Sequence, residues 1–533
     1  MSPCAPSPRD LLATRALGVI PKLLTLQDRN RHSATYGCFD RNFWHYKIID
    51  FPSGMAQEFV WPLALACTLD IPGNPYHQDA TIREWVRAGI LYAASSAHAD
   101  GSCDDYFPFE KAGGAAAFSL LACAESYRLL DFDEPTALDF FIKRADWLAT
   151  HHESGRLTNH QALIVCCLDA VADLTGVDRW REARESRLAR VLEWQNPEGW
   201  FQEYEGCDPG YHTLTISLLA RIHERSPSPA LGMAIEKAIR LAAEFVHADG
   251  SFGGEYASRN TYNFFPHGFE LFGRHFPEAL AITDAWLKGA ADGLAPCHDD
   301  DHILGHHAWN MLLAWQDYVT ARPAATSSQR SSVSFPEAGL SILRGDKWEL
   351  YVALNKGAVF RFFRDGRCIA SDTGVSLKTT SGHIAVTHLV DRYETQAQGN
   401  RIEISGDMGW AKQKAMTPLR LIALRLIMLC GGRFKPDLVR KLLQKALITG
   451  KNAAPFRFRR TLEVGTAGVL HIIDHISADS WNDVAAAAIG CDQTSIYVVM
   501  SRTFQRAQLQ PWTDLTDKIP KAGNAPLEIR RSF

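Results

Sequence analysis

A loop rich in glycine, acidic and aromatic residues recurs along the first 320 residues, and each copy precedes an apolar run with helical spacing. The copy at 196–215 is the clearest, and the copies at 98–106 and 247–256 both begin His-Ala-Asp-Gly-Ser. Six copies start near residues 51, 98, 151, 196, 247 and 297. Such a repeat indicates units that cannot bury their apolar faces alone and therefore pack on their neighbours. It constrains the fold more than any other feature of the chain.

Each repeat unit contains two predicted helices, one after the loop and one leading to the next loop. Apolar residues at i, i+3, i+4 and i+7 predict amphipathic helices at 80–97, 135–152, 179–195 and 229–247. Six such hairpins predict an (α/α)6 toroid over residues 1–321, with inner helices sharing a core and the loops gathered at one end. An open array of helical pairs is the alternative, although such arrays usually have shorter and more numerous units.

The sequence changes character after residue 321, where a polar stretch at 322–333 predicts a linker. Short apolar runs separated by turn residues then predict an antiparallel β-sandwich over 334–533. The fold class expected is therefore α+β multidomain, a helical toroid followed by a sandwich. The predicted strands lie at 339–345, 348–357, 358–366, 383–391, 401–410, 456–464, 469–478 and 495–501.

Two predicted helices at 417–450 interrupt the sandwich and carry many basic residues. Residues 331–533 have a net charge of +10 and the remainder −14, which suggests contact between the two parts, an anionic partner, or two differently solvated surfaces. The insertion is predicted to contact an anionic membrane surface or a polyanion, or else to pack on the sheet. Its basic residues are Arg420, Arg425, Arg433, Lys435, Arg440, Lys441, Lys445 and Lys451.

Cysteine usage and the missing targeting signals favour a cytosolic protein, peripheral to the inner membrane face if 417–450 binds there. The twelve cysteines form no C-x-x-C pair, which is typical of reduced thiols. The start of the chain lacks the basic and apolar segments of a signal peptide, and no apolar run is long enough to cross a bilayer. No phosphate-binding glycine loop or serine elbow is present. We therefore predict no cofactor and no nucleic-acid partner, and a divalent metal is left open without positive support.

Two short motifs carry a resemblance to a known family. Asn159-His160 opens a predicted inner helix, and Asp208-Pro-Gly-Tyr211-His212 follows Glu198-Gly-Trp-Phe-Gln-Glu. A toroid followed by a sandwich, with these motifs, resembles the heparinase II/III-like polysaccharide lyases. The resemblance implies cleavage of a uronate-containing polysaccharide by β-elimination, with Tyr211 as base or acid, His160 as its partner and Asn159 binding the uronate carboxylate.

The chemistry of elimination explains such a set of residues. A proton on C5 beside a carboxylate is very weakly acidic, so the carboxylate must be neutralised and a basic group held at hydrogen-bonding distance. The family also has a histidine segment of the H-x-D kind early in the sandwich. Residues 371–383 lack that pattern, and His383 and His388 are the nearest substitutes.

Further polar and aromatic residues in the repeated loops are candidates for substrate contact. For Asn159 the simpler interpretation is a helix N-cap, and for Tyr211 an aromatic packed under its loop. Residues 297–307 are dense in Asp and His, so substrate contact, a metal site and plain helix capping all remain open there. The predicted substrate-binding residues are Trp44, Gln57, Glu58, Asp105, Glu203, Asp208, His212, Arg259, Asn260, His267, His302 and His306.

Three other functions compete with the lyase hypothesis. A glycoside hydrolase would use two carboxylates from the set Asp104, Asp105, Glu203, Glu205, Asp208 and Glu255. A uronyl C5-epimerase would share the proton abstraction and omit the elimination. A non-catalytic carbohydrate-binding or assembly factor in exopolysaccharide production would be held at the membrane by 417–450.

Overall fold

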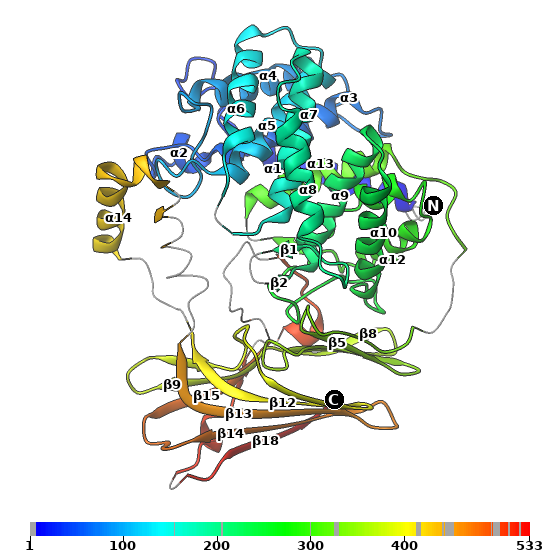
Figure 1. Cartoon of the computed structure of the whole chain (residues 1–533), viewed down its shortest axis with the longest axis vertical. Helices are drawn as coiled ribbons and strands as arrows, with labels where there is room; N and C mark the ends of the chain where they lie inside the picture. The colour runs from blue at the N-terminus through cyan, green and yellow to red at the C-terminus, as the bar shows by residue number, and fades with distance from the viewer. Residues whose placement is uncertain are drawn as a thin grey trace.

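Paired helices form a closed ring in the computed structural model of the chain (Figure 1). The structure describes residues 7–153, 155–203, 206–298, 300–324, 330–411, 417–436, 438–439, 442, 452–491, 493, 501–509, 512–521 and 524–533. The inner helices are α3 (Val60–Thr68), α5 (Gly113–Leu129), α7 (Thr158–Thr175), α9 (Pro209–Arg225), α11 (His267–Phe272) and α13 (Asp301–Gln316). Each inner helix contacts the next, and α13 contacts α3. The predicted helical toroid is therefore confirmed.

The outer helices each pack beside an inner one. They are α1 (Pro8–Leu26), α4 (Ala80–Ser96), α6 (Pro135–Thr150), α8 (Arg181–Glu193), α10 (Pro229–Glu244) and α12 (Glu278–Ala291), and short turns α2 (Arg41–Trp44) and η1 (Gly54–Phe59) precede α3. The inner helix α5 is buried at every position from Gly113 to Tyr127, whereas α10 buries one stripe only. A helix surrounded by other helices must be apolar or small on all sides, and an outer helix on one side only.

The N-terminal helix α1 closes the ring. It packs against α13 and α12 at the other end of the helical part of the chain. Leu12, Ala16, Ile20 and Leu23 are fully buried in this contact region. The sixth repeat thus takes its second helix from the start of the chain rather than from the residues that follow it.

Two antiparallel sheets follow the ring. The first contains β4 (Val333–Phe335), β5 (Leu340–Arg344), β6 (Trp348–Ala353), β7 (Phe360–Arg364) and β8 (Arg367–Asp372), in that order. The second runs β17 (Trp512–Asp514), β15 (Val484–Gly490), β9 (Gly374–Thr379), β10 (Ile384–Val386), β12 (Arg401–Trp410), β13 (Ala453–Val464), β14 (Leu470–Ala478) and β18 (Leu527–Ser532), with β11 (Glu394–Gln398) on β12. The predicted antiparallel sheets are confirmed, and the last predicted strand, 495–501, lies almost wholly outside the described residues.

The five-stranded sheet lies between the ring and the nine-stranded sheet (Figure 1). Successive side chains of a strand point to opposite faces. Tyr351 and Phe363 accordingly pack in the core shared with the ring, while their neighbours Leu350 and Phe362 pack in the core between the two sheets. Both faces of this sheet are therefore buried, which explains why its central strands carry apolar side chains on both faces.

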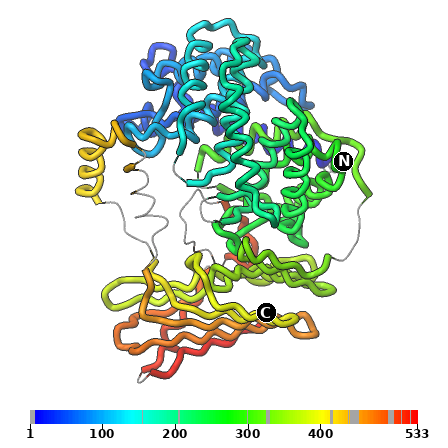
Figure 2. Tube along the Cα trace, in the orientation of Figure 1, coloured from blue at the N-terminus to red at the C-terminus, as the bar shows by residue number. Residues whose placement is uncertain are grey.

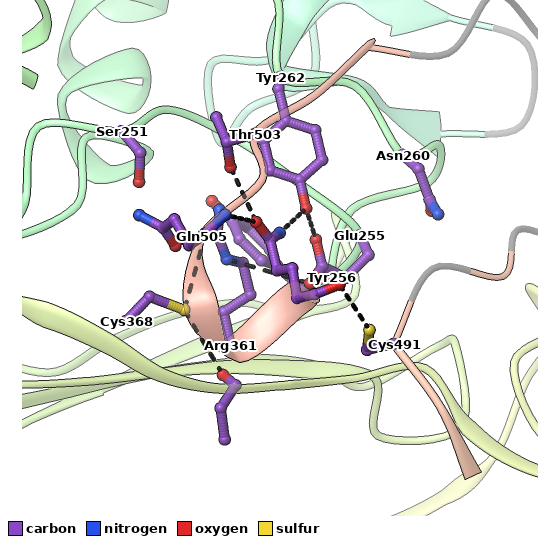
Figure 3. A network of polar contacts seen from close by, with 12 residues as sticks. Ser251, Glu255, Tyr256, Asn260, Tyr262, Arg361, Cys368, Cys491, Thr503 and Gln505 are labelled. Carbon is purple, nitrogen blue, oxygen red and sulfur yellow. Dashed lines mark hydrogen bonds and ion pairs between the residues drawn. The ribbon is translucent and has the colours of Figure 1, made fainter. Parts of the chain in front are cut away.

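The C-terminal segment 501–509 returns to the ring and joins its fifth loop (Figure 2). The Tyr262 hydroxyl donates to Glu255 and accepts from Gln508 Nε2 at 3.0 Å, and Arg361 Nη2 donates to Gln505 Oε1 at 2.8 Å (Figure 3). Burial and the nearby Glu255 carboxylate raise the pKa of Tyr262 well above its usual value, so it remains a hydrogen-bond donor. This buried network fixes the sheets to the ring.

The basic insertion contains one described helix, α14 (Pro418–Cys430), followed by the turn η2 (Gly432–Phe434). It lies beside the ring, near α2 and away from the sheets (Figure 1). Packing on the sheet, one of the two alternatives, is therefore wrong for this helix. The second predicted helix, with Arg440, Lys441, Lys445 and Lys451, lies outside the described residues except at isolated positions. No described helix is long and apolar enough to cross a membrane.

Candidate functional site

The repeated loops precede the inner helices and so lie together at one end of the ring, which we call the loop end. The sheets meet the ring at the later loops. Ala338 N–H donates to Glu198 of the fourth loop at 2.9 Å, Lys356 Nζ donates to the Glu255 carbonyl of the fifth, and Ser501 pairs with His298 of the sixth. The fourth, fifth and sixth loops therefore contact the C-terminal part of the chain.

Tyr211 lies in the first turn of α9 and is held there by a buried ion pair. Asp208 Oδ1 accepts the Tyr211 N–H at 3.0 Å, and Asp208 Oδ2 accepts Arg259 Nε at 2.5 Å. The Arg259 guanidinium carbon lies 4.6 Å from the centre of the Tyr211 ring. Asp208 is 0% and Arg259 2% exposed, whereas the Tyr211 side chain is only partly buried. The ion pair thus fixes the start of α9 and leaves the tyrosine accessible.

Asn159 is not an N-cap, because the cap position of α7 falls on Leu157. Glu203 of the fourth loop caps the helix instead: its Oε1 accepts the Asn159 backbone N–H at 2.9 Å and the Asn159 side-chain amide at 2.8 Å. Burial raises the pKa of Glu203, and this effect outweighs the charges of Arg259 and His160, which lower it. Glu203 therefore lies within electrostatic reach of both the Arg259–Tyr211 pair and His160.

His160 is partly exposed, with 19% of its side chain accessible. Its Nδ1 lies 2.6 Å from Glu153 Oε2, and the other Glu153 oxygen accepts the Gly114 N–H at 3.1 Å. The imidazole packs closely on the start of α5, because a Cβ added to Gly114 would lie 2.5 Å from His160 Cε1. A buried carboxylate and a glycine surface thus set the position of this histidine.

A second histidine–carboxylate pair lies across a phenylalanine from the first. His306 Nδ1 lies 2.5 Å from Glu58 Oε2, and Trp309 donates to Glu58 Oε1 at 2.5 Å. The Phe118 ring stacks on His306 with 4.0 Å between centres and meets His160 edge-on at 6.3 Å. Phe118 thus connects the sixth and first loops to the third. His306 and Glu58 themselves are buried, at 3% and 1% exposure.

Several predicted substrate contacts have structural partners instead. The Gln57 amide is 2% exposed and bonds Phe39 N–H, the Gly37 carbonyl and the Gly89 carbonyl. His212 is 0% exposed and bonds the Ala238 carbonyl, and burial lowers its pKa to about 4. These contacts give Gln57 and His212 packing roles rather than substrate contacts, a difference from our expectation.

His267 also lies away from the loop end. It bonds Asp317, which follows the C-terminal end of α13, and it is 2% exposed. Because α13 has 16 residues, Asp317 and the His267 side chain bonded to it lie about 20 Å from the loops that precede the inner helices. The sequence predicts that each loop stays at one end of the ring. The fifth instead continues along α9 to reach the short α11, since Thr261, Phe265 and Gly268 bond in turn to Asp208, Thr213 and Ser217.

The remaining predicted contacts are placed near the loop end. Trp44 is partly buried and its indole donates to the Leu26 carbonyl at 2.7 Å. Asp105 accepts from Ser53 at 2.6 Å, and His302 lies 3.5 Å from Asp300, which also caps α13. All three are partly exposed. Their substrate contacts stay predictions.

Asn260 joins the ring to the sheets through a lysine that the sequence did not single out. Lys356 Nζ is fully buried and donates to Asn260 Oδ1 at 3.0 Å and to the Glu255 and Ala257 carbonyls. Burial lowers the pKa of Lys356 to about 7. Burial and the nearby Lys356 charge lower the pKa of His388 to about 3, so this substitute for the family's histidine is neutral and 4% exposed.

Two residues of the site, Glu153 and Lys356, were therefore missed in the sequence. Glu153 stands in a loop before a predicted inner helix, the same signal that identified the other loop carboxylates, whereas nothing in the turn Asn355-Lys356-Gly357 indicates a buried cation. Among the described residues, no group of three or more His, Cys, Asp or Glu side chains is arranged to hold a metal ion.

Comparison with known proteins bears on the fold. The sequence matches no protein-family model and no curated protein. The chondroitin AC lyase of Streptomyces coelicolor A3, solved with chondroitin sulphate, is similar with a TM-score of 0.54 at 10% identity, covering 92% of this chain and 69% of that one. Heparinase III gives a TM-score of 0.50 at 10% identity over 92% and 73%. Cellobiose 2-epimerase from Bacillus thermoamylovorans B4167 gives 0.44 at 9% identity over 57% and 98%.

The two lyases share the order of a helical ring followed by sheets over nearly all of this chain. A likeness at 10% identity shows the fold and not the reaction. The polysaccharide lyase-like fold expected from the two motifs is confirmed to that extent.

Proposed function

We propose that this protein is a polysaccharide lyase that cleaves a uronate-containing chain by β-elimination, with Tyr211 and His160 transferring the proton. One observation carries the proposal: these two proton-carrying side chains are accessible at the loop end, while the groups that hold them, Asp208, Arg259 and Glu153, are almost fully buried. Accessible reacting groups on a rigid, buried support are what a preorganised site requires.

Elimination would start with transfer of the C5 proton to Tyr211 in its phenolate form. The C5 electron pair would form the C4–C5 double bond as the bond from C4 to the 4-oxygen breaks, and the same proton or one from His160 would pass to the leaving 4-oxygen. The Arg259 guanidinium over the Tyr211 ring supports this step, because it stabilises the phenolate that must be present before the proton is taken. Glu153 supports His160 by holding one ring nitrogen, so that the other faces away from the carboxylate. The carboxylate role of Asn159 remains part of the proposal, although its amide already donates to Glu203.

The hydrolase alternative finds less support. A hydrolase needs two carboxyl groups that reach the substrate. Glu203, Asp208 and Glu255 are each 0% exposed and accept hydrogen bonds from the protein. Asp104 is 6% exposed and accepts from His98 and two backbone N–H groups, and Glu205 lies outside the described residues.

The test is ultraviolet absorbance from 4,5-unsaturated uronate during incubation with a panel of acidic polysaccharides. We expect the wild-type protein to generate it with at least one substrate, and Tyr211→Phe to lower kcat by at least ~100-fold because the transferable proton is lost. Tyr318→Phe, which alters a tyrosine beyond the opposite end of α13, is the matched control and should keep the wild-type rate.

Each contrary outcome assigns a different reaction. New reducing ends without the absorbance would replace the proposal with hydrolysis. Exchange of the C5 proton with solvent, without cleavage, would replace it with epimerisation. Binding to a polysaccharide with none of these changes would overturn catalysis in favour of a binding role.

A further inference from the structure

The described helix of the basic insertion exposes apolar side chains on most of its circumference. Only Met428 is buried, and Leu424 and Arg425 beside it are partly buried. The other large apolar side chains are between 46% and 79% exposed, and we call them the α14 surface: Leu419, Leu421, Ile422, Leu426, Ile427, Leu429 and, after the helix, Phe434. An apolar patch of this extent on a water-soluble protein marks an interaction site.

The helix is attached to the ring next to the first repeated loop. Arg425 forms an ion pair with Asp50 at 2.7 Å and lies over the Phe51 ring at 5.4 Å. Tyr46 and Ile48, only a few residues before Asp50, are 57% and 71% exposed. The segment of the ring to which α14 is attached therefore also exposes apolar side chains.

The charged residues within 417–436 all have the same sign. Residues 417–436 contain Arg420, Arg425, Arg433 and Lys435 and no acidic residue. Arg433 and Lys435 are exposed beside Phe434, at the C-terminal end of the helix, where their charges also complement the helix dipole. A partner of this segment must therefore provide both an apolar region that the side chains can enter and negative charge beside it.

We propose that the α14 surface docks onto the headgroup region of an anionic lipid bilayer. A helix of this length spans about 20 Å, too short to cross a bilayer and suited to lie flat in its interface. In that position the leucines and isoleucines enter the boundary between headgroups and acyl chains, while the exposed Arg420, Arg433 and Lys435 contact lipid phosphates. The proposal is independent of the reaction at Tyr211, and it gives the protein a second activity, surface attachment.

Vesicle flotation with the full-length protein tests this proposal. Vesicles of phosphatidylcholine alone are compared with vesicles that also contain phosphatidylglycerol. We expect at least ~10-fold more protein to float with the anionic vesicles, and most of this gain to disappear at high salt. The variant Leu419→Ser/Ile422→Ser/Leu426→Ser removes apolar groups from exposed positions and should abolish flotation while leaving the melting temperature unchanged.

Two further variants separate the contributions. Arg433→Glu/Lys435→Glu should lose the preference for anionic vesicles. Met233→Ser/Leu509→Ser removes exposed apolar side chains elsewhere, on α10 and at the end of the segment 501–509, and should float like the wild type.

Three results would overturn the proposal. They are absence of wild-type flotation, equal flotation of the wild type and the triple serine variant, and equal flotation with and without phosphatidylglycerol. A dimer that forms without vesicles and is lost in the triple variant would assign the surface to a second copy of the chain instead.

Discussion

At the scale of single residues, a glycine determines where His160 stands. Gly114 lies in the first turn of α5 with an ordinary helical backbone, so alanine there would favour the helix by about 1 kcal/mol. The added Cβ would nevertheless lie 2.5 Å from His160 Cε1, and the imidazole would have to move. We predict that Gly114→Ala lowers kcat of the proposed lyase at least ~10-fold with little change in melting temperature.

The control for this prediction is Gly18→Ala in α1, where an added Cβ meets no atom within 4 Å. It should raise stability by up to ~1 kcal/mol and leave activity unchanged. If Gly114→Ala kept full activity, the observed position of His160 would not matter for catalysis, and its proposed role would fail.

The sequence allowed part of the site to be predicted at this scale and not the rest. Tyr211 and His160 follow loop residues at the starts of inner helices, so their place at the loop end follows from the repeat. The direction of a polar side chain does not follow from the repeat, and Gln57 and His212 therefore point into the protein. Lys356 could not be predicted either, since its partners Glu255 and Asn260 lie about a hundred residues away.

At the scale of elements, β7 illustrates a strand with two different cores. Phe362 packs between the sheets, whereas Phe363 packs toward the ring, with its ring 4.6 Å from that of His247. We predict that Phe362→Ala and Phe363→Ala each cost about 3–5 kcal/mol. Of these two variants, only Phe363→Ala should also divide thermal unfolding into two transitions in calorimetry, because it weakens the contact between ring and sheets. Equal, single transitions in both variants would show that this face does not couple them.

Helices were easier to predict than strands because their periodicity is longer and repeated. The predicted outer helices at 80–97, 135–152, 179–195 and 229–247 match α4, α6, α8 and α10 closely. The strand β15, with the sequence Val-Ala-Ala-Ala-Ala-Ile-Gly, was missed because alanine favours helices and is depleted in strands. Its neighbours β9 and β17 impose the extended conformation, and they are distant in sequence.

At the scale of the whole molecule, the contact between ring and sheets contains a titratable group. The pKa of Lys356 falls from 10.5 to about 7 on burial, so between these pH values the unfolded chain binds one proton more than the folded chain. Stability contributed by this lysine therefore rises with pH across that window. We predict that the free energy of unfolding of the wild type, relative to Lys356→Met, increases by ~1 kcal/mol or more between pH 7 and 9 in denaturant titrations.

The exposed Lys378 on β9 provides the matched variant, Lys378→Met, whose difference from the wild type should stay constant over the same pH range. A constant difference for Lys356→Met as well would mean that Lys356 titrates alike in the folded and unfolded chains, contrary to its burial between ring and sheets.

The pairing of α1 with α13 also means that two helices in contact are synthesised far apart in time. At about 5–20 residues per second, a ribosome needs roughly 15 to 55 s to proceed from the end of α1 to the start of α13. During this interval the first five hairpins can assemble, while Leu12, Ile20 and Leu23 lack α13, the helix against which α1 mainly packs. The nascent chain therefore carries an incompletely covered apolar helix throughout this interval, which makes it a natural client for ribosome-associated chaperones.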